Sequence, residues 1–173
     1  LSLSENHLYT VEAFRDYLDQ LTPDGQLLIL RWDVDAPRLV SNAVALLGVE
    51  EAGKRVAVLL ETREGDREDP PQMIFMLKKR PWTEDETARM AAWPGVQPVI
   101  VPGRHVDEPY ASLFAGRTSF ADYVAQAKTR VDPVFDDRPF FFARAKPWGL
   151  PGAMKRAFLW ILLPVLALCA LFL

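Results

Sequence analysis

Three short groups of polar and aromatic residues carry the side chains that could bind a ligand. They are Glu5 with Tyr9, Arg31-Trp32-Asp33, and Asp136-Asp137-Arg138. The Glu5 carboxylate could bind a cationic amine, and the Tyr9 ring could line an apolar slot. Two adjacent acids before an arginine could clamp a cation or fix a loop by hydrogen bonds. The first two groups are candidate substrate-binding residues, and the third is a candidate loop clamp.

Each group also has a purely structural explanation. Tyr9 could pack at the start of a helix while Glu5 stays in solvent, and Arg31 could form a surface ion pair. In the third group an aspartate could cap a turn and the following arginine could pair with it. We favour the structural explanation for the first and third groups and leave both explanations open for the second.

The composition excludes several classes of site. The net charge of -3 gives no sign of a nucleic-acid partner. The single cysteine, Cys169, rules out a disulfide framework and any cysteine-based metal site. His7 and His105 are far apart in sequence and form no metal-ligand pattern, so we predict no metal. The 173 residues suffice for one domain with a real core.

The elements that must position these residues begin with a helix and a strand. Thr10 is a good N-cap for an amphipathic helix from Val11 to Leu21, and the turn Thr22-Pro23-Asp24-Gly25 follows it. The apolar run Leu27–Leu30 then predicts a strand buried on both faces, as in a parallel sheet. Ligands bind beyond the carboxyl ends of parallel strands, which is where Arg31 would lie.

The remaining pattern alternates helices with strands. The strands Arg55–Thr62 and Met73–Lys79 read as an antiparallel hairpin, which we place at the sheet edge. A capping box at Thr83 and Glu86 opens a helix to about Trp93. Further segments are a helix at 38–47, a strand at 97–101, and helical pieces at 108–115 and 119–128. This order predicts an α/β fold with a parallel sheet and helices on its faces.

The C-terminal residues predict membrane attachment. Residues 157–173 form an apolar run without charge, slightly short of a full span of about 20 residues. Lys155 and Arg156 precede this run, which places the preceding domain on the cytoplasmic side by the positive-inside rule. We therefore expect a domain at 1–145, a linker at 146–156 and a truncated transmembrane helix at 157–173. A buried C-terminal helix or a signal-like segment is the alternative.

Two separated segments carry distinctive motifs. The first runs from Leu3 to Ile29 and includes Leu8-Tyr9-Thr10-Val11-Glu12-Ala13-Phe14. The second is Asp136-Asp137-Arg138-Pro139-Phe140-Phe141-Phe142, shortly before the apolar run. Both segments resemble the spermidine synthase family, and most closely its large membrane-embedded bacterial relatives. The resemblance implies the C-terminal half of a Rossmann-like class I methyltransferase fold with an antiparallel edge hairpin, followed by a transmembrane helix.

The resemblance also implies the activity. The complete protein would transfer an aminopropyl group to an amine from decarboxylated S-adenosylmethionine, or a methyl group from S-adenosylmethionine. The family's glycine-rich loop and catalytic aspartates would lie upstream of residue 1, and no G-x-G-x-x-G occurs in the 173 residues. We therefore expect this chain to be a fragment that is inactive alone. The alternatives are a non-catalytic methyltransferase-like module of a polytopic membrane protein and an ordinary methyltransferase.

Arg31 departs from the pattern of the family. Soluble spermidine synthases have a neutral polar residue, often glutamine, at a position similar to that of Arg31, and there it faces the diamine. A guanidinium is always charged and repels a protonated diamine unless Asp33 or Asp35 pairs with it. An arginine at this place fits an anionic or carboxylate-bearing substrate better.

Overall fold

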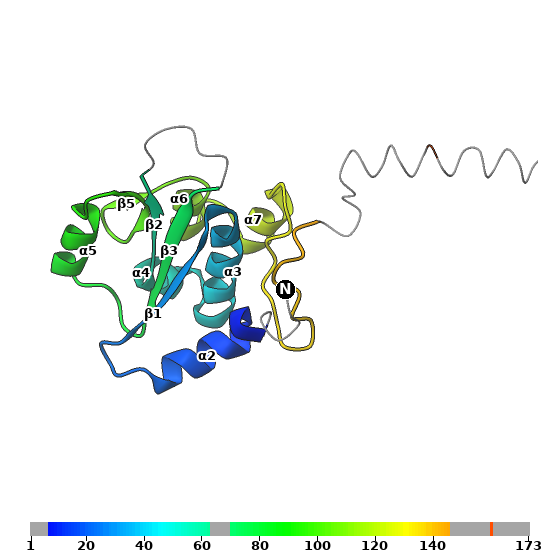
Figure 1. Cartoon of the computed structure of the whole chain (residues 1–173), viewed down its shortest axis with the longest axis horizontal. Helices are drawn as coiled ribbons and strands as arrows, with labels where there is room; N and C mark the ends of the chain where they lie inside the picture. Colours follow the sequence, from blue (N-terminus) through cyan, green and yellow to red (C-terminus); the bar gives the residue numbers. More distant parts are fainter. Residues whose placement is uncertain (1–6, 63–69, 146–159, 161–173) are drawn as a thin grey trace, which may run out of the picture.

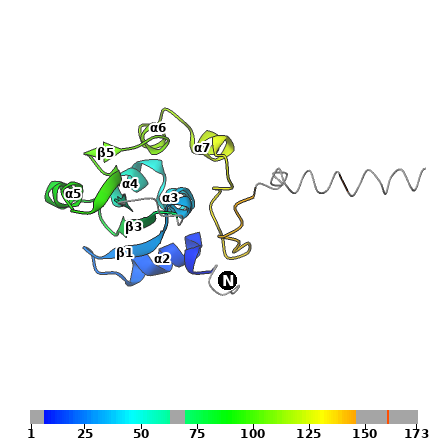
Figure 2. The same cartoon turned by 45° about the horizontal axis from the view of Figure 1, so that its top comes forward.

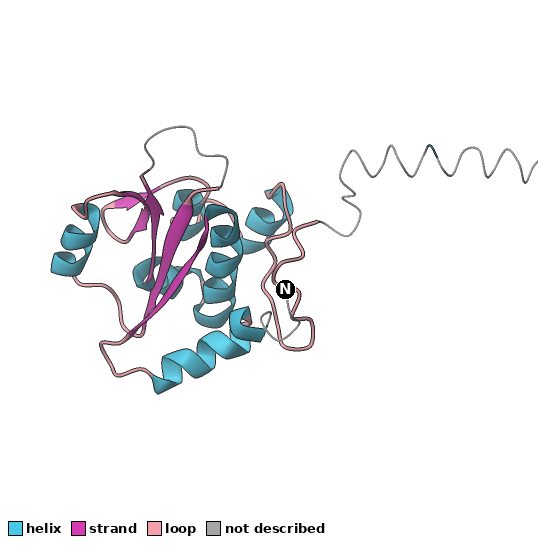
Figure 3. Cartoon of the chain, viewed as in Figure 1, coloured by secondary structure: helices cyan, strands magenta, loops and turns pink. Residues whose placement is uncertain are grey.

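The computed structural model describes residues 7–62, 70–145 and 160. The first two ranges form a mixed α/β fold (Figures 1 and 3). Five strands lie in one sheet: β1 (Gln26–Trp32), β2 (Val56–Glu61), β3 (Gln72–Lys78), β4 (Val96–Val101) and β5 (His105–Val106). The helices are η1 (His7–Tyr9), α2 (Val11–Gln20), η2 (Asp33–Asp35), α3 (Ala36–Leu47), α4 (Val49–Arg55), α5 (Glu84–Ala91), α6 (Tyr110–Phe114) and α7 (Phe120–Gln126).

The sheet has the order β1-β3-β2-β4-β5, and every neighbouring pair is antiparallel. Leu28 lies opposite Met76 on β3, and Met76 lies opposite Ala57 on β2. Because β3 is antiparallel to both of its neighbours, β1 and β2 run in the same direction. The helices α3 and α4 connect these two strands, so the carboxyl ends of β1 and β2 meet at the same edge of the sheet.

One face of the sheet carries the main core. Helices α2, α3 and α4 pack there, because their apolar positions recur at helical spacing. Phe14 of α2 contacts Phe75 of β3, with ring centroids 5.9 Å apart. The fully buried side chains of this core include Phe14, Leu39, Val40, Met73, Phe75, Leu77 and Ile100.

The opposite face is only partly covered. Helix α5 packs there against a small cluster that includes Leu59, Met76 and Met90, and it lies on the other side of the strands from α3 (Figure 1). On β1, Leu28 is 51% exposed and Leu30 is 57% exposed. The prediction of a strand buried on both faces is therefore wrong for β1, because only its inward side chains meet the helices.

Local sequence signals account for the helix starts. The Thr10 side chain accepts a hydrogen bond from the Ala13 amide and caps α2. Thr83 and Glu86 form the predicted capping box of α5. Pro37 lies in the first turn of α3, where its missing N–H costs no helical hydrogen bond. These three helices begin within two residues of their predicted starts.

The sheet differs from the sequence prediction in two respects. The predicted hairpin of β2 and β3 is confirmed, but it lies in the interior of the sheet, because β3 inserts between β1 and β2. The predicted parallel pairing of Leu27–Leu30 is wrong, since β1 pairs with β3 in antiparallel register. A short apolar run indicates a strand, and it does not give the direction of the neighbouring strand.

The expected linker at 146–156 and most of the expected transmembrane helix at 157–173 lie outside the described residues. Of that apolar run only Trp160 is described, and it is 78% exposed. Within the described ranges, no helix has the length and apolar character needed to cross a bilayer.

The unequal burial of β1 and β3 predicts that the same substitution has different effects on stability in the two strands. Leu77→Ala removes a fully buried side chain and should lower the free energy of unfolding by about 2–5 kcal/mol. Leu28→Ala makes the same chemical change at a half-exposed position and should cost less than about 1 kcal/mol. Urea denaturation of the two variants in mild detergent measures both values, and equal costs would contradict the one-sided burial of β1.

A buried ion pair between β3 and α5 gives a pH prediction. Lys78 is 4% exposed, and its ammonium donates to Glu86. That hydrogen bond, together with the Thr83 amide, lowers the Glu86 pKa from its ordinary 4.5 to about 2. Glu86 therefore contributes stability above pH 4.5 that is lost as the pH falls toward 2. We expect the unfolding midpoint of the unchanged chain to fall between pH 5 and pH ~2.5. In Glu86→Gln and in Lys78→Met the midpoint should fall less over the same pH range.

Candidate functional site

The carboxyl ends of β1 and β2 define the edge at which ligands bind in open α/β sheets. Arg31 and Trp32 end β1, and η2 and α3 follow directly. The segment 130–145 returns to this region and lies beside η1 and the start of α2 in both views (Figures 1 and 2). Three distant parts of the chain thus meet near the end of β1.

Arg31 is held on its faces and on its edge. Its guanidinium carbon lies 4.8 Å from the Phe142 ring centroid and 5.6 Å from that of Tyr9. Its Nε donates to Oδ2 of Asp35 at 3.2 Å. Cation–π contacts with two aromatic rings, together with an ion pair, hold the guanidinium at this place.

Asp35 joins two arginines. Its carboxylate is 2% exposed, and its second oxygen accepts a hydrogen bond from Arg144 at 2.9 Å. We call Tyr9, Arg31, Asp35, Phe142 and Arg144 the arginine cluster. Two cations share one buried anion, so the cluster carries a net charge of about +1 at neutral pH. Arg31 and Arg144 remain 24% and 44% exposed, so both side chains can reach a ligand.

Arg38 of α3 holds the segment 130–145 in place. The side chain is 4% exposed, and its terminal nitrogen donates to the carbonyls of Phe140, Phe141 and Ala143 at 2.9, 2.6 and 3.0 Å. Its Nε donates to the Asp132 carbonyl at 3.2 Å. Burial lowers the pKa of Arg38 to about 10, so the guanidinium stays charged at neutral pH. These bonds bring Phe142 and Arg144 to the arginine cluster.

Asn42 lies one helical turn after Arg38 and makes the matching connection to η1. Its amide nitrogen donates to the Tyr9 carbonyl at 2.6 Å, and its oxygen accepts from the Val134 amide at 2.8 Å. The Val11 amide in turn donates to the Val134 carbonyl at 2.8 Å. The Tyr9 ring also stacks on Phe141 with centroids 4.6 Å apart. Tyr9 is thereby fixed through its backbone and its ring.

The structure brings together only part of the predicted site. Tyr9 and Arg31 meet, whereas Trp32 is half-buried at the end of β1 and has no described contact with the cluster. Asp33 accepts a hydrogen bond from the Val34 amide at 2.7 Å and closes a turn, so Asp35 pairs with Arg31 in its place. Glu5 lies outside the described residues.

Asp136, Asp137 and Arg138 form a separate exposed turn. The Arg138 amide donates to the Phe135 carbonyl at 2.9 Å, and the Arg138 side chain lies 3.9 Å from Asp137. The Asp136 amide donates to a carboxylate oxygen of Glu12 at 3.1 Å, which ties the turn to α2. This geometry is that of a loop fixed by hydrogen bonds, and it supports the structural explanation.

Of the described partners of Arg31, sequence reasoning misses Phe142. Asp35 was weighed as one of two possible partners, and its spacing of four residues from Arg31 favours it. Arg38 and Asn42 interrupt the apolar face of α3 at the same helical spacing, which signals a polar contact with another segment. Phe142 and Arg144 carry no such signal, because their position depends on the return of a loop more than 100 residues away.

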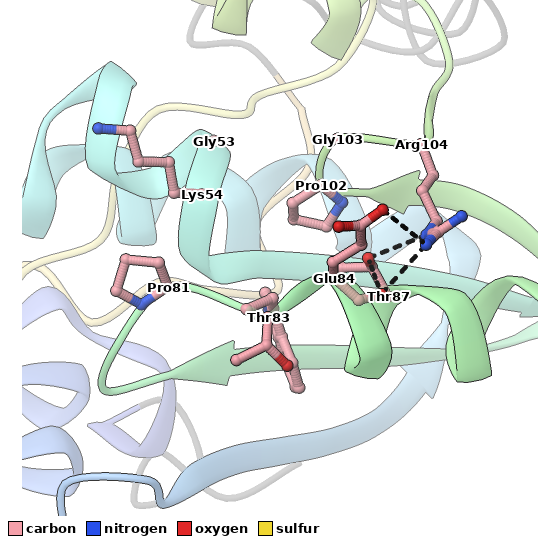
Figure 4. Close-up of a pocket in the computed structure, with 10 residues that line it drawn as sticks. Gly53, Lys54, Pro81, Thr83, Glu84, Thr87, Pro102, Gly103 and Arg104 are labelled. Atoms are coloured by element: carbon pink, nitrogen blue, oxygen red, sulfur yellow. Dashed lines mark hydrogen bonds and ion pairs between the residues drawn. The ribbon is translucent and has the colours of Figure 1, made fainter.

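A hollow lies at the opposite edge of the sheet (Figure 4). It has a volume of about 420 Å³ and contains Lys54 and Arg104. Figure 4 shows Arg104 joined to Glu84 and Thr87, and Lys54 pairs with Glu50 and Glu51. Both cations are thus already neutralised. No group of three metal-ligating side chains occurs among the described residues.

The shared carboxylate of Asp35 gives a prediction for the cluster. Asp35→Asn leaves two arginines without their buried anion and should lower the free energy of unfolding by about 3 kcal/mol. Asp107→Asn serves as the control, because Asp107 is half-exposed and pairs only with His105 on the surface. Asp107→Asn should lower the free energy of unfolding by less than about 1 kcal/mol. Equal losses in a denaturation series would show that Asp35 is not a buried ion-pair partner.

Comparison with known proteins identifies no relative. No family model matches the chain, and no curated protein or solved structure matches it either. The strand order and the arginine cluster are therefore the observations on which a functional proposal must rest.

Proposed function

We propose that this chain is the C-terminal part of a spermidine synthase-like transferase domain of a membrane-anchored, cytoplasmic-facing protein. The complete domain would transfer an aminopropyl group from decarboxylated S-adenosylmethionine, or a methyl group from S-adenosylmethionine, to an amine. The observation that carries the proposal is the strand order β1-β3-β2 with Arg31 at the carboxyl end of β1.

The strand order supports a Rossmann-like origin in a specific way. β1 and β2 run in the same direction and are connected through α3 and α4, as in a β-α-β unit. β3 then inserts between them in the antiparallel direction. A final antiparallel strand is what the resemblance to class I methyltransferases implies, and the insertion explains why β1 and β2 are not paired in parallel.

The free side of β1 supports the same proposal. Among the described strands β1 pairs only with β3, so the backbone N–H and C=O groups on its other edge have no strand partner among the described residues. An unprotected apolar edge strand is a liability for an isolated sheet. A further strand beside β1 would remove that liability and would continue the sheet as half of a larger Rossmann-like domain requires.

The charge of the arginine cluster indicates the class of acceptor. Asp35 can neutralise one of the two arginines, so a protonated diamine would meet net repulsion of about 1 kcal/mol or more at short range. A carboxylate would instead receive hydrogen bonds from a guanidinium that is already held in place. We therefore propose an acceptor that carries a carboxylate as well as the reacting amine.

The chain's own residues would serve the acceptor side of the reaction. Arg31 and Arg144 would bind the carboxylate, and Tyr9 and Phe142 would keep water from the guanidinium face of Arg31. The nucleotide donor would supply an electrophilic carbon next to a sulfonium sulfur. The sequence has no glycine-rich loop to hold that donor, so the donor site and the general base belong to residues outside this chain.

A non-catalytic methyltransferase-like module is the second candidate. The observation that favours it is the saturation of the polar groups, because no buried side-chain nitrogen or oxygen among the described residues lacks a hydrogen-bond partner. In such a module Arg31 would only fasten the segment 130–145 to the end of β1. An ordinary methyltransferase would share the same strand order.

A matched pair of ligands tests the acceptor class. Ornithine is putrescine with one added carboxylate, so calorimetry on the chain in detergent compares the two directly. We expect ornithine to bind about tenfold more tightly than putrescine, a difference of about 1.4 kcal/mol. Arg31→Gln should remove that preference, and Lys54→Gln, which changes a charge at the opposite edge, should preserve it. Equal binding of both ligands by the unchanged chain would refute a carboxylate-bearing acceptor.

Donor binding distinguishes the enzyme from the module. The longer protein that contains this chain should bind decarboxylated S-adenosylmethionine or S-adenosylmethionine in calorimetry, and the tighter of the two identifies the transferred group. Binding of neither nucleotide would exclude the transferase and leave the non-catalytic module.

A further inference from the structure

A second potential binding site lies between α3 and the C-terminal helices α6 and α7. The hollow there has a volume of about 470 Å³, which is within the range of small-molecule sites. Its walls come from Pro37 of α3, from Tyr110 and Tyr123, and from Val131. None of the residues of the arginine cluster lines it, so this inference does not depend on the proposed function.

The floor of the hollow is aromatic and uncharged. Tyr110 and Tyr123 are 6% and 4% exposed, and their ring centroids lie 6.2 Å apart at an angle of 43°. The Tyr123 hydroxyl donates to the Pro37 carbonyl at 3.3 Å. Burial raises the pKa of both phenols, so both stay neutral at physiological pH. Tilted aromatic walls of this kind favour contact with another aromatic ring.

Lys128, at the rim of the hollow, has no ion-pair partner among the described residues. The Glu108 carboxylate accepts hydrogen bonds from the Ser112 amide and hydroxyl and from Arg117. The ammonium of Lys128, which also lines the hollow, forms no ion pair within the described part of the chain. A cationic ligand would therefore find the only acid of the rim already engaged, while an anionic ligand would find a free lysine.

We propose that this hollow binds a small aromatic carboxylate, with the ring against Tyr110 and Tyr123 and the carboxylate at Lys128. The size of the hollow fits one ring with a short aliphatic link. The aromatic floor and the cation at the mouth together match the two ends of such a molecule, and an amine of the same shape would match only one of them.

Fluorine NMR of the chain in lipid nanodiscs tests this proposal with 3-(4-fluorophenyl)propionate as the probe. Nanodiscs without protein give the baseline for partition into lipid. We expect saturable binding of the carboxylate that is at least about tenfold tighter than that of 3-(4-fluorophenyl)propylamine, which corresponds to about 1.4 kcal/mol. Equal binding of the acid and the amine, or no binding above the baseline, would overturn the proposal.

Two variants locate the bound probe. Lys128→Gln should weaken binding of the carboxylate about tenfold but change binding of the matching neutral alcohol less than about twofold. Ala127→Phe places a large side chain at the wall of the hollow and should abolish binding of both. Lys54→Gln is the control for a lysine elsewhere on the surface and should bind like the unchanged chain. Unaltered binding in Ala127→Phe, with an unchanged melting curve, would place the probe elsewhere and overturn the assignment.

Discussion

The Arg38 guanidinium is buried and donates to four backbone carbonyls of the segment 132–143. Taking a cation out of water costs several kcal/mol, and each hydrogen bond to a charged group contributes about 1.5–3 kcal/mol. The four hydrogen bonds and the ion pair with Asp132 offset this cost, and they specify where this segment lies. Together with the Asn42 hydrogen bonds and the stacking of Tyr9 on Phe141, Arg38 places Phe142 and Arg144 beside Arg31.

Local signals predicted the elements of this fold better than their arrangement. The caps at Thr10 and Thr83 depend on residues three apart in the chain, and both are confirmed. The burial of β1 depends on what covers its second face, and no nearby residue encodes that. The order of the strands likewise reflects the insertion of β3, which is a contact between segments about 45 residues apart. Sequence patterns of period two or 3.6 carry no information on such pairings.

The residues of the candidate site likewise fall into those that the sequence predicts and those whose position depends on distant contacts. Tyr9 and Arg31 were predicted because each lies at the boundary of a helix or strand that the sequence reveals. Asp33 and Asp35 are both possible ion-pair partners of Arg31 in the sequence, and the spacing of four residues favours Asp35, whereas Trp32 enters the prediction only because it is adjacent to Arg31. Phe142 and Arg144 reach the cluster through long-range hydrogen bonds made by Arg38. Sequence reasoning therefore misses Phe142 and Arg144, the residues whose position depends on tertiary contacts.

The charge of the cluster also bears on the choice between enzyme and module. A cluster that only fastens a loop is most stable when its charges balance, since an excess charge in a partly buried place is costly. Here two arginines share Asp35, and both remain partly open to solvent. Because both arginines reach solvent, the excess positive charge costs little free energy and stays available to an anion. The excess positive charge beside the carboxyl end of β1 therefore favours a binding role for the cluster over a merely structural one.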